Sequence, residues 1–498
     1  MGVWIHSFIS LMNPLTLLWL IIGSIVGLIF GALPGIGPSL AMAIVIPFSF
    51  YMDAHIGLPL LTAVWGSAIV GGSITAILIN TPGTGGNVAT CFDGFPLAQQ
   101  GKAKIALGIS TSSSAIGGIV GSIVLYIGII AFSKILVLFG PAELFLLGIV
   151  AILVLAVIFE ESPLKTLIAG FSGLLISFIG YDIITGYVRF DLGTRYLYDG
   201  IEFLTMVIGL FAIARMMELV THTEIISETN KLLGSMLEGL LIPFKYIKTV
   251  LRSILIGIFI GFLPGLGISS AALLAYGAAK KSSSKPETFG KGNYEGVVAP
   301  ETANNAVIGG AMIPGLALGI PGNSDTAVFL AALMMYGISP GQSLLVRNSD
   351  LVILIVASLI FINLIFTLNM IVFHGILARL TTLPLSYLVP PVVVLALTGA
   401  FAISSNIWDV TTAIIFGFIG YGMIKLKYPV VAFLMGRILG PVIESNFGRA
   451  LIISGGSYSI FFKSIISKIL VISIIVFIVL TLFRLRSTRF IKKKAIEK

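Results

Sequence analysis

The sequence predicts an all-α membrane protein with many spanning helices, and three observations predict it: high hydropathy, low charge and Gly-Pro breaks inside apolar segments. Of the 498 residues, 57% are hydrophobic and only 10% are charged, against about 25% charged residues in an ordinary soluble domain. A soluble fold of this length needs far more charge to cover its surface. The 56 glycines are typical of membrane helices, which approach one another closely at small residues.

Eight apolar segments have the length of a membrane-spanning helix, about 20 residues. We expect no cleavable signal peptide at the N-terminus. The first apolar stretch of the chain, which begins near Leu15 and precedes these eight segments, is itself long enough to span. The predicted spans are residues 105–130, 142–159, 165–180, 201–220, 351–373, 384–402, 409–424 and 464–483.

Four other apolar segments are interrupted by Gly and Pro, and the interruptions form two matched pairs. A helix that stops inside a bilayer leaves backbone N–H and C=O groups unpaired, which is tolerated only beside protein or a polar cavity. The first pair is Gly27-x3-Gly31-x-Leu33-Pro34-Gly35-x-Gly37 and Gly257-x3-Gly261-x-Leu263-Pro264-Gly265-x-Gly267, and the second is Pro82-Gly83 and Pro321-Gly322, in the same order.

The matched breaks predict two structural repeats with discontinuous, broken or re-entrant helices. We assign a first membrane repeat to residues 1–220, a cytoplasmic linker to 221–250 and a second membrane repeat to 251–463. A last transmembrane helix and a basic cytoplasmic tail follow at 464–498. Together these make about 10–12 membrane segments.

Loop charges predict that the two repeats are inverted. The loop at 51–57 carries Asp53 and neither Lys nor Arg, whereas the equivalent loop of repeat two holds four lysines between residues 280 and 291. After the second break the difference in positive charge reverses. Repeat one carries lysines at 102 and 104 there, whereas repeat two carries Arg347, whose charge Asp350 balances. By the positive-inside rule the N-terminus lies outside and the linker and C-terminus lie inside. Inverted repeats are the architecture of many secondary transporters.

Broken helices of this kind predict a site for an anion and a cation. The N-terminus of a half-helix carries partial positive charge and free N–H donors, so it holds a carboxylate without a buried Lys or Arg. Free carbonyls at opposing helix ends coordinate Na⁺. The alternative for the Asn and Thr side chains at the breaks is helix capping alone. The predicted substrate-binding residues are Asn80, Thr81, Gly83, Thr84, Asn304, Asn305, Gly322, Asn323, Ser324 and Thr326.

Asp325 is the one acidic side chain within the breaks, and an intramembrane carboxylate is a candidate functional group. We predict that it couples a cation, with capping of the following helix as the alternative. Glu301, upstream, is interpreted as an interfacial cap or a hinge residue. Tight helix packing alone is the alternative for the residues predicted as hinge or packing points, which are Pro34, Gly35, Pro264 and Gly265.

Signatures of several other function classes are missing. Cys91 is the single cysteine and the four histidines are scattered, so no disulfide framework and no firm metal site are expected. No Gly-x-x-x-x-Gly-Lys-Ser/Thr phosphate loop occurs, and we predict no catalytic residue and no cofactor beyond a coupling Na⁺ or H⁺. Much of the net charge of +9 lies in residues 484–498, behind an apolar helix. That placement indicates a cytoplasmic anchor rather than nucleic-acid binding.

Longer motifs run in a fixed order from about Asn13 to Ser457. They include Asn80-Thr81-Pro82-Gly83-Thr84, Asp93-Gly94-Phe95-Pro96-Leu97-Ala98, Phe289-Gly290-Lys291-Gly292, Pro300-Glu301-x-Ala303-Asn304-Asn305-Ala306 and Gly319-Ile320-Pro321-Gly322. At these motifs the chain resembles the large membrane subunit of the tripartite tricarboxylate transporters, the TctA family. The resemblance implies a secondary permease for small organic anions, energy from a Na⁺ or H⁺ gradient, and two partners: a small membrane subunit and an extracytoplasmic solute-binding protein.

Two stretches depart from the usual pattern of that family, and both lie in the predicted site. They are Gly85-Gly86-Asn87 and Asn323-Ser324-Asp325. An added acid at Asp325 repels a carboxylate substrate unless it is protonated or bound to a cation. The departure therefore favours a cation role for Asp325, or a different substrate.

The predicted function is a secondary active permease that imports tri- or dicarboxylates through a prokaryotic cell membrane, as a multi-pass protein in the lipid bilayer. The alternatives are a passive anion channel and a structural membrane scaffold. Paired discontinuous helices favour the transporter over both. The sequence leaves a homo-oligomer open.

Overall fold

The computed structural model describes residues 7, 9–33, 35–136, 138–158, 163–182, 184–220, 232–381 and 389–479. Within these ranges the elements are helices, apart from an antiparallel hairpin of β1 (Gly180–Tyr181) and β2 (Val188–Arg189). The longer helices are α2 (Pro14–Gly31), α3 (Pro38–Ser49), α4 (Ala54–Ile79), α5 (Val88–Gln99), α6 (Ala103–Leu136), α7 (Pro141–Ile158), α8 (Pro163–Ser177), α12 (Ile247–Phe262), α13 (Gly267–Ser282), α14 (Glu295–Leu318), α15 (Ser324–Met335), α17 (Ser349–Leu380), α18 (Val389–Ser404), α19 (Ile407–Lys425) and α20 (Val430–Ile453).

Short helical pieces complete the fold. They are α9 (Phe203–Val207), a π-helical segment (Ile208–Ile213) and α10 (Ala214–Val220), which follow one another, and then α11 (Met236–Leu241), α16 (Gln342–Arg347) and a last apolar helix, Ile465–Val479. Seven stretches of the described chain are long and apolar enough to cross a membrane: Pro14–Gly31, Ala54–Ile79, Ala103–Phe132, Phe203–Val220, Ser349–Leu380, Ile407–Lys425 and Val430–Ile453. The chain is therefore an all-α polytopic membrane protein, as predicted.

Every predicted span overlaps a helix, but the predicted spans omit α20. Arg437, Glu444 and Arg449 interrupt its apolar run, and its mean hydropathy of 1.3 is the lowest of the seven stretches. In the structure two of these charges have partners inside the fold: Arg437 donates to the carbonyl of Ile201 at 3.2 Å, and Glu444 pairs with Arg189 at 2.6 Å. Charged side chains with partners of this kind are compatible with a membrane helix.

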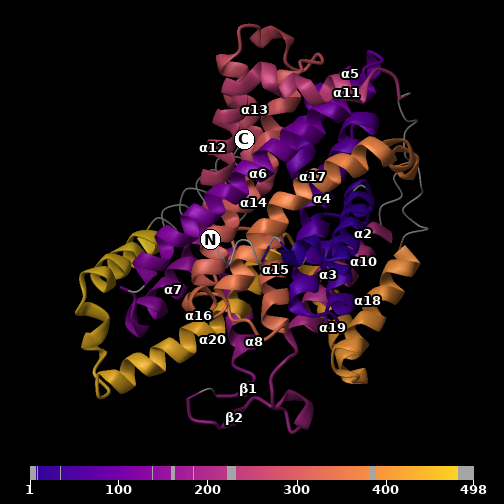
Figure 1. Ribbon diagram of the computed structural model, residues 1–498. Coiled ribbons are helices and arrows are strands. Elements are labelled where there is room, and N and C mark those ends of the chain that lie inside the picture. Colours follow the sequence, from indigo (N-terminus) through magenta and orange to yellow (C-terminus); the bar gives the residue numbers. More distant parts are fainter. Residues whose placement is uncertain are drawn as a thin grey trace, which may run out of the picture.

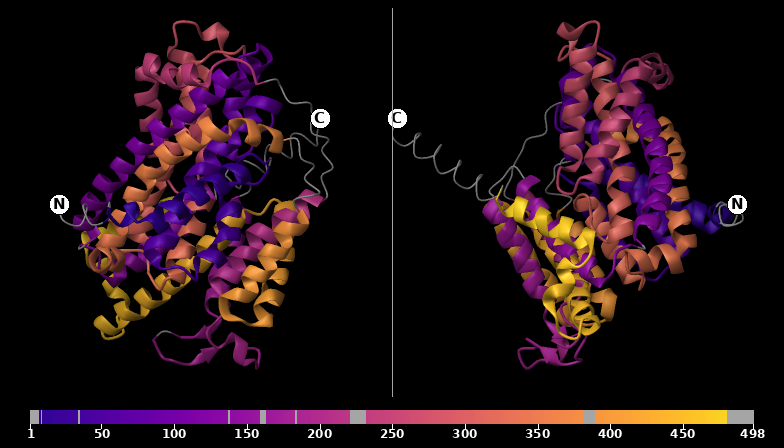
Figure 2. Two further views of the ribbon diagram at one scale, coloured as in Figure 1. Left: turned by 45° about the vertical axis from the view of Figure 1, so that its right-hand side comes forward. Right: turned by 90° about the vertical axis from the view of Figure 1, so that its left-hand side faces the viewer.

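The two halves of the chain use the same helix pairings. In the first half α2 packs on α4, and in the second half α12 packs on α14. α7 and α8 from the first half pack on α20 from the second, while α18 and α19 pack on the α9–α10 segment of the first half. Figure 2 shows the group formed by α7, α8 and α20, with α20 towards the yellow end of the colour scale beside purple helices. Each half of the chain thus contributes helices to a bundle that it shares with the other half.

Lysines from both halves gather at one end of the molecule, where α5, α11 and α13 lie at the top of Figure 1. Lys280 and Lys281 occupy the last turn of α13. Gln100, at the end of α5, donates to the carbonyl of Lys291 at 2.8 Å, and Lys104 donates its N–H to Leu233 at 3.0 Å. The β1–β2 hairpin marks the opposite end.

Candidate functional site

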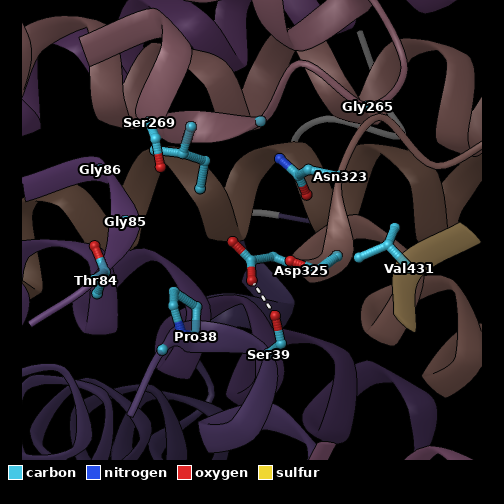
Figure 3. A pocket seen from close by; sticks show the side chains of 14 residues that line it. Pro38, Ser39, Thr84, Gly85, Gly86, Gly265, Ser269, Asn323, Asp325 and Val431 are labelled. Atoms are coloured by element: carbon cyan, nitrogen blue, oxygen red, sulfur yellow. Dashed lines mark hydrogen bonds between the residues drawn. The ribbon is translucent and has the colours of Figure 1, made fainter. Parts of the chain in front are cut away.

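Four helix breaks converge on one cavity of about 250 Å³ (Figure 3). The breaks separate α2 from α3, α4 from α5, α12 from α13, and α14 from α15. All four contribute to the lining, and α20 adds one residue. The lining residues are Gly37, Pro38, Ser39, Thr84, Gly85, Gly86, Gly265, Gly267, Ile268, Ser269, Asn323, Ser324, Asp325 and Val431.

The cavity is bordered by helix N-termini. α3 begins at Pro38, α13 at Gly267 and α15 at Ser324, and all three residues line the cavity. The first N–H groups of a helix have no intrahelical partner and carry partial positive charge. The lining contains no Lys, Arg or His, so these N-termini are the electropositive groups that the described residues bring to the cavity.

Asn323 caps the N-terminus of α15. Its Oδ1 accepts hydrogen bonds from the N–H and from the hydroxyl of Thr326, both at 2.9 Å. The backbone of Asn323 is extended, as an N-cap requires. Asn323 therefore makes the capping contact that was the alternative to substrate binding, and it also lies on the cavity wall.

Asp325 lies in the first turn of α15 and is 4% exposed. The hydroxyl of Ser39, on α3, donates to its Oδ1. Figure 3 shows this contact as a dashed line, with the Asp325 carboxylate in the middle of the lining residues. A contact across 286 positions of the sequence thus joins the second half of the chain to the first at the cavity.

Thr84 begins a hydrogen-bond chain that leads from the cavity wall into the protein. Its Oγ1 donates to Asn87 Oδ1 at 2.5 Å, and Asn87 Nδ2 donates to Glu301 Oε1 at 3.1 Å. Glu301 lies on α14, is 0% exposed and also accepts from Thr90 Oγ1 at 2.5 Å and Ser114 Oγ at 2.9 Å. The interpretation of Glu301 as an interfacial residue is wrong, because its carboxylate is enclosed by α5 and α6.

Asn304 and Asn305 lie on α14 one turn after Glu301, and they do not line the cavity. Both are buried, at 0% and 1% exposed, and neither amide group has a hydrogen-bond partner among the described residues. Asn304 packs against Gly86, which lines the cavity, on the side of Gly86 away from the cavity. A Cβ atom on Gly86 would lie 2.2 Å from the Oδ1 of Asn304.

Several predicted binding residues lie outside the cavity lining. Asn80 is exposed and ends α4 in a left-handed conformation, and Thr81 bonds the carbonyl of Ile79 at 3.3 Å. Gly83 and Gly322 hold the breaks together: Gly83 donates its N–H to Gly72 at 3.2 Å, and Gly322 accepts from the N–H of Gly265 at 2.8 Å.

The predicted hinge residues differ in what surrounds them. Pro34 lies outside the described residues, and Pro264 is half-buried. Gly35 and Gly265 have φ of +78° and +88°, which few residues other than glycine adopt. Arg215 Nε on α10 donates to the carbonyl of Gly35 at 2.7 Å.

Sequence reasoning missed Ser39, Ser269 and Val431 as lining residues. Ser39 and Ser269 lie within two residues of Gly37 and Gly267, the last glycines of the two Leu-Pro-Gly motifs. The role predicted for those motifs is that of hinge or packing points, which does not extend to the hydroxyls that follow them. No sequence signal marks Val431, which tertiary packing of α20 brings to the cavity.

A model described as the tripartite tricarboxylate transporter TctA family matches residues 17–435. The chain belongs to the TctA family. This membership makes it a component of a tripartite transporter, a class that implies further subunits. No solved structure matches the chain.

Two similar proteins of the bacterium Agrobacterium vitis extend the comparison. An uncharacterized 52.8 kDa protein in the TAR-I ttuC' 3'region is 33% identical over 489 residues, which cover 97% of this chain and 96% of that protein. An uncharacterized protein in the TAR-II ttuC' 3'region is 34% identical over 234 residues, which cover 47% of this chain and 97% of that protein. The similarity to the first of these therefore covers the TctA-family chain almost from end to end.

Proposed function

We propose that this TctA-family chain is the permease subunit of a secondary active transporter that imports small organic anions such as tri- or dicarboxylates, driven by a gradient of Na⁺ or H⁺. The observation that carries the proposal is the cavity where the N-termini of α3, α13 and α15 meet without a basic side chain. Helix N-termini bind anions through free N–H groups and the helix dipole. A volume of about 250 Å³ suits a small ligand.

In the proposed complex a substrate carboxylate rests on these N-termini. The hydroxyl of Ser269 adds a side-chain donor, whereas the hydroxyls of Ser39 and Thr84 already donate to Asp325 and Asn87. Asp325 lies in the same lining, and its negative charge repels a carboxylate unless a proton or cation neutralises it. We therefore assign Asp325 to the coupling of substrate with a cation.

Alternating access in this proposal uses two inverted repeats that move against each other around the cavity. The matching helix pairs of the two halves support the repeats. The lysine-rich end is the cytoplasmic one by the positive-inside rule, so the N-terminus lies outside and the C-terminus inside. A small membrane subunit and an extracytoplasmic solute-binding protein complete the transporter in a prokaryotic cell membrane.

Uptake of radiolabelled citrate and a dicarboxylate panel into proteoliposomes tests the proposal, with and without imposed Na⁺ and H⁺ gradients. We expect gradient-driven accumulation by the wild type, loss of it in Asp325→Asn, and retention in Asp350→Asn, an exposed acid. The assay is repeated with the small subunit and binding protein of the same system. Equilibration regardless of the gradient indicates a passive anion channel, and no flux under either condition leaves the scaffold alternative.

A further inference from the structure

The carboxyl group of Glu301 is fully buried and has no basic partner among the described residues. It is 0% exposed, and none of the described ion pairs includes it. Its contacts are neutral donors: Thr90, Ser114 and Asn87. Burying an ionised carboxylate in this way is costly, so such a group acquires a proton, a partner charge or a metal ion.

A second side chain beside Glu301 lacks partners altogether. Asn304 lies three residues further along α14, on the same face of the helix, and is 0% exposed with both amide atoms unpaired. Its Oδ1 points at the turn that contains Gly86 and Asn87, and Asn87 is the residue that bonds Glu301. Burying an amide without a hydrogen bond is costly, which calls for a ligand at this position.

We propose that Glu301, Asn304, Thr90 and Ser114 form a binding site for a Na⁺ ion. A proton neutralises Glu301 but leaves the Asn304 oxygen unpaired, whereas a cation uses both. The Thr90 and Ser114 hydroxyls rotate to offer oxygen lone pairs, since each hydroxyl accepts as well as donates. With one carboxylate the site suits a monovalent ion, and no group of three His, Cys, Asp or Glu side chains suited to a metal ion occurs in the described ranges.

This site is separate from the cavity but communicates with it. Asn87 bonds both Glu301 and Thr84, and Thr84 lines the cavity. Gly86, on the cavity wall, lies against Asn304. An ion at Glu301 therefore orders the cavity wall that the substrate contacts. This coupling of ion and substrate rests on the proposed transport function, whereas the binding of Na⁺ does not depend on it.

Thermal unfolding of the purified full-length chain in detergent tests the site, with NaCl compared with choline chloride at equal concentration. A ligand that binds the folded state raises the unfolding temperature saturably. We expect a Na⁺-specific rise in the wild type, its loss in Glu301→Gln, and about a tenfold higher half-saturating Na⁺ concentration in Asn304→Ala. Glu295→Gln is the matched control, because Glu295 is a buried acid on the same helix that accepts from Thr249, and it keeps the wild-type response.

Two results overturn the site: a wild type that does not distinguish Na⁺ from choline, or variants at Glu301 and Asn304 that keep the full Na⁺ response. If Glu301→Gln does not fold, Asn304→Ala alone decides, since it keeps the Glu301 carboxylate. A Na⁺ response that Asp325→Asn abolishes and the Glu301 and Asn304 variants keep moves the ion to the cavity and also overturns it. A Na⁺ response without carboxylate uptake leaves the ion site standing while the transport proposal fails.

Discussion

At the residue scale, two buried acids of the second half accept hydrogen bonds from side chains of the first half and so connect the two halves. Asp325 on α15 accepts from Ser39 in the first half, and Glu301 on α14 accepts from Asn87 and Thr90, also in the first half. An unpaired buried polar group costs about 1–3 kcal/mol. These contacts therefore hold the breaks of one half against helices of the other.

The cap at Asn323 gives the first prediction. Asn323→Ala removes the acceptor of the Thr326 N–H, and loss of a cap costs about 1 kcal/mol. We expect a lower unfolding temperature in detergent and reduced uptake, because the first turn of α15 also carries Asp325. Asn323→Ser, which can cap, should stay close to wild type in stability. Equal stability of the Ala variant and wild type would contradict a capping contribution.

The loop of the β1–β2 hairpin gives a prediction on pH. Hydrogen bonds from the Thr185 hydroxyl and the Ile184 N–H, with Arg189 nearby, hold the pKa of Asp182 below its ordinary value. A carboxyl with a lowered folded pKa contributes stability above its unfolded pKa of about 3.9 and loses it as pH falls through the folded pKa.

Amide hydrogen exchange at Gly186, whose N–H bonds the Asp182 carbonyl, reports on this loop. After correction for the intrinsic rate, we expect constant protection from neutral pH down to about pH 4 and a loss below it. Asp182→Asn should lack the pH-dependent step. A step retained in that variant would assign it to another group.

Small residues set how closely the paired helices approach at the element scale. A Cβ atom on Gly31 would lie 2.0 Å from the carbonyl oxygen of Ala68 on α4, and one on Gly261 would lie 2.5 Å from that of Val307 on α14. Matching contacts follow at the breaks, where Gly83 packs on the Gly31 carbonyl and Gly322 on that of Gly261. At all four glycines a side chain would therefore meet backbone atoms of a neighbouring element.

Alanine at these glycines should therefore force the helix pairs apart. We expect Gly31→Ala and Gly261→Ala each to destabilise the protein by about 1–3 kcal/mol, as overpacking does, and to lower its unfolding temperature. Gly277→Ala on α13 is the matched control, since its Cβ would meet no atom within 4 Å, and alanine is the better helix former. A control variant as unstable as the others would refute the packing explanation.

Asp93 on α5 secures the loop between α13 and α14. Its Oδ1 accepts the N–H groups of Gly290, Gly292 and Asn293 at 2.7–2.9 Å, and its Oδ2 accepts the Tyr276 hydroxyl at 2.9 Å. We expect Asp93→Ala to raise hydrogen exchange across residues 290–293, because those N–H groups lose their acceptor. Glu287→Ala, at an exposed position of the same loop, should leave exchange there unchanged.

The distribution of charge is the main feature at the scale of the whole molecule. Lysines near α5, α11 and α13 gather at one end although their loops belong to different halves. At the hairpin end Arg189 pairs with Asp182 and Glu444. Such asymmetry is the physical basis of the orientation that we propose.

Cysteine labelling measures that orientation. In a Cys91→Ser background we expect a membrane-impermeant maleimide to label Leu192→Cys, which is 84% exposed in the wild type, on intact cells. Lys285→Cys, in the exposed loop after α13, should react only after permeabilisation. The reverse pattern would place the N-terminus inside and overturn the proposed topology.

Hydropathy and motif spacing by themselves determined the membrane class, most of the spans and the four breaks. They could do so because bilayer thickness imposes a minimum helix length and because Pro and Gly interrupt helices locally. The family resemblance in the motifs is likewise confirmed by the match over residues 17–435. These properties depend on residues close together in the chain.

Only the tertiary structure decided which break residues meet. Asn80 and Thr81 lie outside the cavity lining while Ser39, Ser269 and Val431 belong to it, although all five are near Gly or Pro breaks or helix starts. Glu301 is enclosed because α5 and α6 pack on α14. Such neighbours lie some 200 positions apart, and their contact is set by helix packing, which local sequence patterns do not encode.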